Sequence, residues 1–152
     1  QAEIISENLG IAIHPGTHAS DIPAVTLPAA TVTEHIDFPS TQNHILIGLP
    51  TLEKNNPDFF AFYIGNEILG GSGLASQLFE VVREQEGLAY SIRSHVMPLQ
   101  QKGPFIISLQ TRNDESAKAR ALVQDHLKTF INNGPSNHEL KKAKQNIAGK
   151  FL

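Results

Sequence analysis

The chain is organised around residues 68–94, which read Ile68-Leu-Gly-Gly-Ser-Gly-Leu-Ala-Ser-Gln-Leu-Phe-Glu-Val-Val-Arg-Glu-Gln-Glu-Gly-Leu-Ala-Tyr-Ser-Ile-Arg-Ser94. Gly70-Gly71 is expected to end one helix, and Ser72 is expected to cap the next. Gly87 is expected to stop this second helix, and residues 88–96 alternate as in a half-exposed antiparallel strand. The predicted buried stripe of the second helix comprises Leu74, Leu78, Val81 and Val82.

The sequence on either side of this stretch predicts further strands and helices. β-branched and apolar residues indicate strands at 31–38, 43–49 and 105–111. Helical spacing and capping residues indicate helices at 3–9, with Gly10 as its stop, and at 57–69, 114–134 and 136–151, the last opened by the capping box Ser136-Asn137-His138-Glu139. This order predicts an α+β fold, a two-layer α/β sandwich in which helices pack on one face of an antiparallel-rich sheet.

Composition excludes several classes of protein. The 152 residues suffice for one ordinary domain, and 40% apolar with 18% charged residues is typical of a globular chain. No apolar run reaches the roughly 18 residues of a membrane span. A formal charge of -3 offers no basic surface for nucleic acid, and the absence of cysteine excludes disulfides and thiolate metal sites.

Metal and anion sites are not favoured by the motifs. None of the seven histidines forms H-E-x-x-H or H-x-x-E-H, and His14 and His18 are separated by Pro15 and Gly16, which oppose a helix. The glycines at 70–73 could form a phosphate loop, but they follow a helix and lack a Gly-Lys-Ser/Thr ending. A helix-to-helix turn that uses positive φ is the preferred interpretation, and the anion site stays a weaker alternative.

Arg83 and Tyr90 form the candidate binding site. Arg83 lies late in the second helix of the central stretch and Tyr90 early in the strand, with Gly87 permitting a sharp turn between them. A guanidinium and a phenol are hydrogen-bond donors suited to peptide carbonyl oxygens. The alternative interpretation is an exposed arginine and a half-buried strand tyrosine without a joint role.

The central stretch, above all Ile68 through Leu78 and Val82 through Ser91, resembles the C-terminal half-domain of the pitrilysin family of zinc peptidases. Segments 42–50, 57–69 and 135–144 are also similar to that family, so the likeness covers almost the whole chain. The resemblance implies that residues 1–25 end a preceding half-domain and its linker. Residues 26–152 then form a non-catalytic C-terminal domain that is truncated at its end.

The resemblance also implies a role. The family pairs an active half-domain, which carries H-x-x-E-H and zinc, with an inactive one whose arginine and tyrosine seven residues apart hold the substrate backbone. Arg83 and Tyr90 match that pair, whereas segment 57–69 offers Phe59, Phe60, Phe62 and Tyr63 in place of zinc ligands. The expectation is a substrate-binding domain without a metal or catalytic residue of its own, with an active H-x-x-E-H domain or subunit as partner, zinc in that partner, and peptide as substrate.

Three further expectations follow from the resemblance. A scaffold subunit of the same fold without peptidase activity is the rival hypothesis. The family suggests a bacterial periplasmic setting, and apolar surface left by excision would favour artificial dimers. Gln77 stands where the family often has arginine, which puts a local ion pair in doubt but leaves the fold expectation unchanged.

Overall fold

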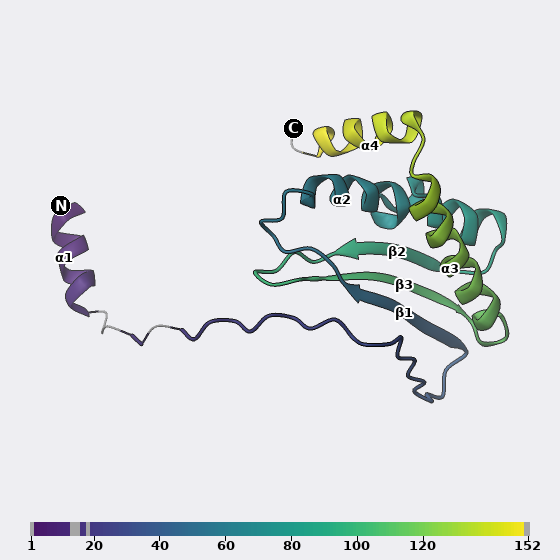
Figure 1. Ribbon diagram of the computed structural model, residues 1–152, viewed down its shortest axis with the longest axis horizontal. Helices are drawn as coiled ribbons and strands as arrows, with labels where there is room; N and C mark the ends of the chain where they lie inside the picture. Colours follow the sequence, from purple (N-terminus) through teal and green to yellow (C-terminus); the bar gives the residue numbers. More distant parts are fainter. Residues whose placement is uncertain (1, 13–15, 18, 151–152) are drawn as a thin grey trace.

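The computed structural model describes residues 2–12, 16–17 and 19–150, and in it helices cover one face of a sheet (Figure 1). Within the described part of the chain the sheet has three strands, β1 (Gln42–Pro50), β2 (Ser91–Val96) and β3 (Pro104–Arg112). Their order is β1-β3-β2, and both pairings are antiparallel. The predicted α+β fold with an antiparallel-rich sheet is therefore confirmed.

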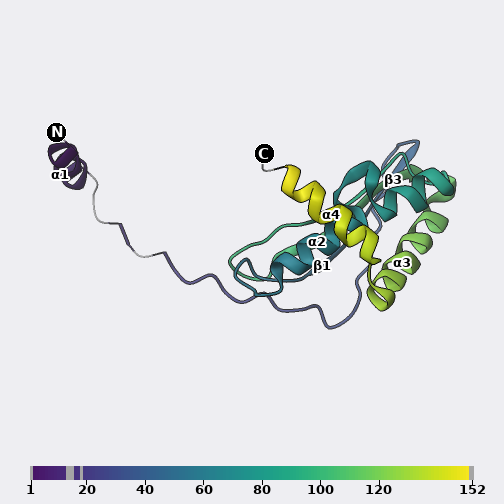
Figure 2. The same ribbon diagram turned by 90° about the horizontal axis from the view of Figure 1, so that it is seen from above.

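Three α-helices lie on this side of the sheet, and the last of them packs against the first rather than on the strands (Figure 1; Figure 2). They are α2 (Phe59–Asn66), α3 (Ser116–Asn133) and α4 (Asn137–Gly149). The short 3₁₀ turn η4 (Asn113–Glu115) precedes α3, so this helix begins two residues after the predicted start. Gly134, at φ 67°, ends α3, and the predicted capping box at Ser136 opens α4.

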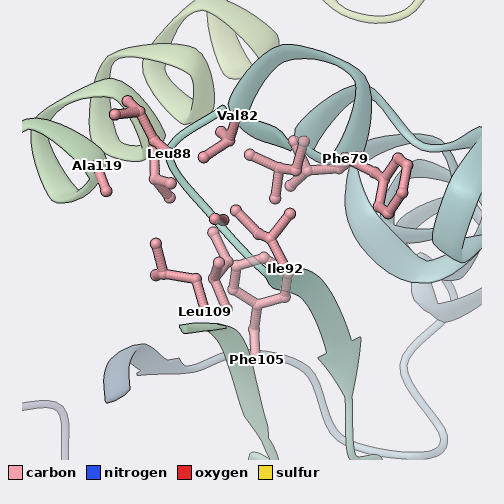
Figure 3. Close-up of a cluster of buried hydrophobic side chains, with 12 residues drawn as sticks. Phe79, Val82, Leu88, Ile92, Phe105, Leu109 and Ala119 are labelled. Carbon is pink, nitrogen blue, oxygen red and sulfur yellow. The ribbon is translucent and has the colours of Figure 1, made fainter. Parts of the chain in front are cut away.

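Alternation along β3 explains why only one face of the sheet is covered. Residues at 105, 107, 109 and 111 are buried, whereas the intervening ones are partly exposed. Register places Ile47 opposite Ile107 and Ile92 opposite Leu109, so these side chains share the helix-facing side. Figure 3 shows Leu109 and Phe105 below Ile92, Leu88 and Val82 in the buried cluster.

The predicted helix at 72–86 is the element that differs most from the expectation. α2 continues into the π-helix η1 (Glu67–Gly71), and a 3₁₀ turn, η2 (Gly73–Ala75), follows. Ser72 does not cap a helix, because its hydroxyl donates to the Glu67 carbonyl at 2.7 Å. The helix resumes only after Ser76 and becomes the π-helix η3 (Phe79–Gln85). Leu74 is therefore 76% exposed, whereas Leu78 and Val82 are fully buried as predicted.

The N-terminal segment corrects two predictions. Helix α1 (Ala2–Ala12) passes through Gly10 instead of ending there, and none of its residues is buried. The predicted strand at 31–38 is wrong: this segment is extended and exposed but pairs with no strand in the described chain. Val32, Ile36 and Phe38 have no covering layer there, and a single strand without a neighbour is not stable. His14 and His18 lie outside the described residues.

Candidate functional site

Arg83 projects from a widened helix. It lies in η3, where i to i+5 hydrogen bonding enlarges the backbone, a feature that is frequent at functional sites. The side chain is exposed, and its Cζ lies 4.7 Å from the centroid of the Phe79 ring. This distance is within the range of a cation–π contact. One face of the guanidinium thus lies over the Phe79 ring, and the side chain is otherwise exposed to solvent.

A tightly bonded turn follows Arg83. The Gly87 amide donates to the Arg83 carbonyl at 3.1 Å, and the Leu88 amide donates to the Val82 carbonyl at 2.9 Å. Gly87 has φ 62°, so the glycine predicted to stop the helix does so in the left-handed region. Because Val82 and Leu88 are both buried, the end of η3 is held against the start of the next strand.

Tyr90 is anchored by its backbone and free at its side chain. Its amide donates to the Gln110 carbonyl of β3 at 2.9 Å, just before β2 begins at Ser91. Its side chain is 55% exposed, although Leu88 and Ile92 in the same alternating series are buried. Tyr90 thus lies exposed at the entrance to β2, one residue before regular pairing starts, which agrees with both interpretations of the site.

Arg83 and Tyr90 each present an exposed hydrogen-bond donor. Among the described residues no hydrogen bond or ion pair joins their side chains to each other or to a carboxylate. Both groups therefore remain able to donate to an incoming acceptor such as a peptide carbonyl oxygen. A guanidinium and a phenol can hold and orient a carbonyl group through such hydrogen bonds.

The sequence did not reveal a buried polar contact that supports the strand carrying Tyr90. Ser94 donates through Oγ to Oδ1 of Asn66 at 2.7 Å, and both residues are buried. Gly70 lies directly over Ser94, so close that a Cβ at residue 70 would be 2.6 Å from the Ser94 amide nitrogen. The inward-facing series of β2 is otherwise apolar, with Ile92 and Val96, so Ser94 is the signal that could have indicated a buried polar partner.

A second polar contact ties the helical turn just before η3 to the last two helices. Nε2 of Gln77 donates to Oε1 of Glu139 at 2.6 Å, and Nε2 of His126 lies 3.0 Å from Oε1 of Gln77. Glu139 also accepts from the Ser136 amide in the capping box. A neutral glutamine thus links α3 and α4 at the position where the family resemblance led us to expect arginine.

This second contact predicts a pH dependence of stability. Burial lowers the pKa of His126, and the Ser136 hydroxyl, with Gln77, lowers the pKa of Glu139. In both groups the folded state disfavours protonation, so their stabilisation is present above the ordinary pKa and is lost as the pH falls through the lowered one. The His126 contribution declines below about pH 6.5, and that of Glu139 declines below about pH 4.3.

We expect the free energy of unfolding to fall between pH 7 and pH 5, and His126→Gln to reduce that fall. Urea unfolding followed by circular dichroism at each pH measures it. His44→Gln, at an exposed histidine on β1, is the matched control and should keep the wild-type slope. An identical pH slope in wild type and His126→Gln would show that burial of this imidazole does not govern the dependence.

No metal site is formed where a zinc motif would stand. Phe59, Phe60, Phe62 and Tyr63 occupy α2, and Phe59 stacks on Tyr63 at 6.3 Å between ring centroids. No group of three or more histidine, aspartate or glutamate side chains that could hold a metal occurs within residues 2–12, 16–17 and 19–150. The aromatic side chains of α2 offer no ligand that fits zinc, so no catalytic step through a metal is derived at this helix.

The glycine cluster is a turn and not a phosphate cradle. Gly73 has φ 61°, as expected of a helix-to-helix turn. The Ser72 amide donates to the Glu67 carbonyl and the Ser76 amide to the Gly73 carbonyl, so these donors are already used. Nearby Glu67 is a buried carboxylate whose ion pair, to Lys150 at 2.8 Å, is satisfied. An added phosphate would face this negative charge, which argues against the anion site.

An apolar hollow of about 330 Å³ lies between α2 and α3, away from the two donors. Phe62, Phe105 and Phe130 contribute to its lining, whereas Arg83 and Tyr90 do not. The polar candidate site is therefore separate from this hollow and lies on the surface of the η3–β2 unit.

Within the described ranges, none of the helices combines the length and the apolar character that a membrane span requires.

Comparison with known proteins finds relatives over nearly the whole chain. The sequence model described as "Peptidase M16 inactive domain" matches residues 4–147. The crystal structure of a peptidase M16 inactive domain from Pseudomonas fluorescens superposes with a TM-score of 0.90 and 38% identity, covering 98% of this chain and 36% of that one.

Two curated relatives differ in what their names say. An uncharacterized zinc protease of Streptomyces coelicolor is 30% identical over 84% of this chain and 28% of its own length. A protein of Helicobacter pylori named a non-peptidase homolog is 40% identical over 54% of this chain and 19% of its own length. The chain thus spans less than a third of either curated relative.

Proposed function

Because the chain belongs to the family of peptidase M16 inactive domains, we propose that it binds extended peptide for an active zinc peptidase domain and performs no hydrolysis itself. The resemblance to the pitrilysin-type zinc peptidases is thereby confirmed at the level of family and fold. Membership of the family does not by itself establish the peptide-binding role or the partner, so both are part of the proposal.

One observation carries the proposal: Arg83 and Tyr90 present free donors from backbone that is bonded to the core. The Arg83 carbonyl is held by Gly87, and the Tyr90 amide is held by β3. A fixed backbone at both residues lowers the ordering cost of binding a peptide, and the two donors align the peptide for attack by a group located elsewhere. Backbone carbonyl oxygens are present in every peptide, so this contact predicts binding without strong sequence preference.

Reconstitution of peptide hydrolysis tests the proposal. The chain is assayed alone, with added zinc, and then with a domain or subunit that carries H-x-x-E-H, using a fluorogenic peptide. We expect no turnover by the chain with or without zinc, and turnover by the assembly well above that of the partner alone. Robust zinc-dependent cleavage by the chain alone would contradict the claim that it lacks chemistry.

A non-proteolytic scaffold subunit is the second candidate. The similarity to the Helicobacter pylori protein named a non-peptidase homolog favours it. Under this hypothesis the chain binds an M16 partner but adds nothing to peptide turnover. Stable assembly without any gain in activity would therefore support the scaffold over the peptide-binding domain.

A further inference from the structure

The π-helix η3 begins with a buried aromatic ring and carries the proposed peptide-binding arginine one turn later. Phe79 is 7% exposed and belongs to the core cluster, at whose border Figure 3 places it. Arg83 is exposed, and its guanidinium carbon lies 4.7 Å from the Phe79 ring centroid. Among the described residues, Phe79 is the aromatic ring that lies under this guanidinium, and the core holds that ring in place.

Fixing the ring matters because arginine is long and flexible. A free arginine side chain loses conformational entropy when it is held in one conformation. The face of an aromatic ring carries negative charge density that attracts a guanidinium and restricts where it lies. An arginine that already rests on a ring loses less freedom when it binds a carbonyl oxygen.

Nearby carboxylates do not perform this orienting role. Glu86 pairs with Lys118 at 3.4 Å, and Glu80 accepts a hydrogen bond from Gln85 at 3.4 Å. Among the ion pairs of the described residues none involves Arg83. The ring of Phe79 is thus the contact that sets the direction of the guanidinium.

We propose that Phe79 is a positioning residue, whose ring face pre-orients Arg83 toward the peptide backbone. This inference rests on the proposed function, since it assumes that Arg83 binds substrate. It differs from a purely structural role in one respect: the effect depends on the electron density of the ring and vanishes when the arginine is removed.

Ring fluorination in the assembled enzyme separates the two roles. Replacing Phe79 by mono-, di- and trifluorophenylalanine keeps the shape of the ring and progressively lowers the negative charge density on its face. We expect kcat/KM for a peptide substrate to fall progressively, by about two- to fivefold at trifluorination, mainly through KM. Phe79→Leu, which removes the ring, should lower kcat/KM at least as much.

The same series in an Arg83→Ala background is the control. There kcat/KM should no longer respond to fluorination, because the cation is gone. A flat response with Arg83 present, or an equal fall without it, would overturn the positioning role while the proposed function stands. If Arg83→Ala itself leaves kcat/KM unchanged, the proposed function fails, and the positioning role fails with it.

Discussion

Arg83→Ala is expected to lower kcat/KM of the assembled peptidase by about tenfold to a hundredfold. A hydrogen bond from a charged donor contributes about 1.5–3 kcal/mol, and each 1.4 kcal/mol corresponds to a factor of ten. Tyr90→Phe removes a neutral donor, so a smaller fall of about three- to tenfold is expected. Steady-state kinetics on a fluorogenic peptide measures both.

Matched controls distinguish binding from folding in this experiment. Arg120→Ala removes an exposed arginine from α3, and Tyr63→Phe changes the other tyrosine of the chain. Both should keep wild-type kinetics. Arg83→Ala itself should change the free energy of unfolding by about 1 kcal/mol or less, because the side chain is exposed and loses only its contact with Phe79. Wild-type turnover in both site variants would remove their proposed role.

Gly70→Ala is expected to destabilise the fold by about 2–6 kcal/mol. A Cβ at residue 70 would lie 2.5 Å from Ser94 Oγ and 2.6 Å from the Ser94 amide nitrogen, so η1 and β2 must separate. Overpacking costs about 1–3 kcal/mol, and loss of the buried Asn66–Ser94 hydrogen bond adds about 1–3 kcal/mol. That is a large share of the roughly 5–15 kcal/mol that stabilises a typical domain.

Gly65→Ala is the control for this prediction. Gly65 lies within α2, and a Cβ there would meet nothing within 4 Å. Helix propensity should therefore raise stability by about 0.5–1 kcal/mol. Urea unfolding of both variants measures the difference, and equal stability of the two would show that the close approach at Gly70 does not constrain the fold.

Local sequence signals predicted most of the folded body because they coincide with its packing. The stops at Gly71, Gly87 and Gly134 and the capping box at Ser136 are all found in the structure. The strand alternation predicted that Ile92 is buried, and the helical spacing predicted that Val82 is buried; both are. In each case the residue type itself favours the observed backbone conformation or burial, without any contact from a distant part of the chain.

The rest depended on contacts that local patterns do not carry. Helical spacing assumes 3.6 residues per turn, so it could not predict the π-helices that widen the chain at 67–71 and 79–85, and it placed Leu74 inside. Strand propensity at 31–38 could not tell that no neighbour would pair with it. The pair Arg83 and Tyr90 was named from its resemblance to a family motif, whereas its support from Phe79 required coordinates.

Peptide affinity measured in the absence of cleavage shows whether this domain holds the substrate. The chain is assembled with a partner whose catalytic glutamate in H-x-x-E-H is replaced by glutamine, and the dissociation constant of an extended peptide is measured by calorimetry. The account predicts that the double variant Arg83→Ala/Tyr90→Phe binds the peptide at least tenfold more weakly than wild type, while Arg120→Ala/Tyr63→Phe binds it equally well. Equal peptide affinity in wild type and the Arg83/Tyr90 double variant would contradict the claim that this domain holds the substrate.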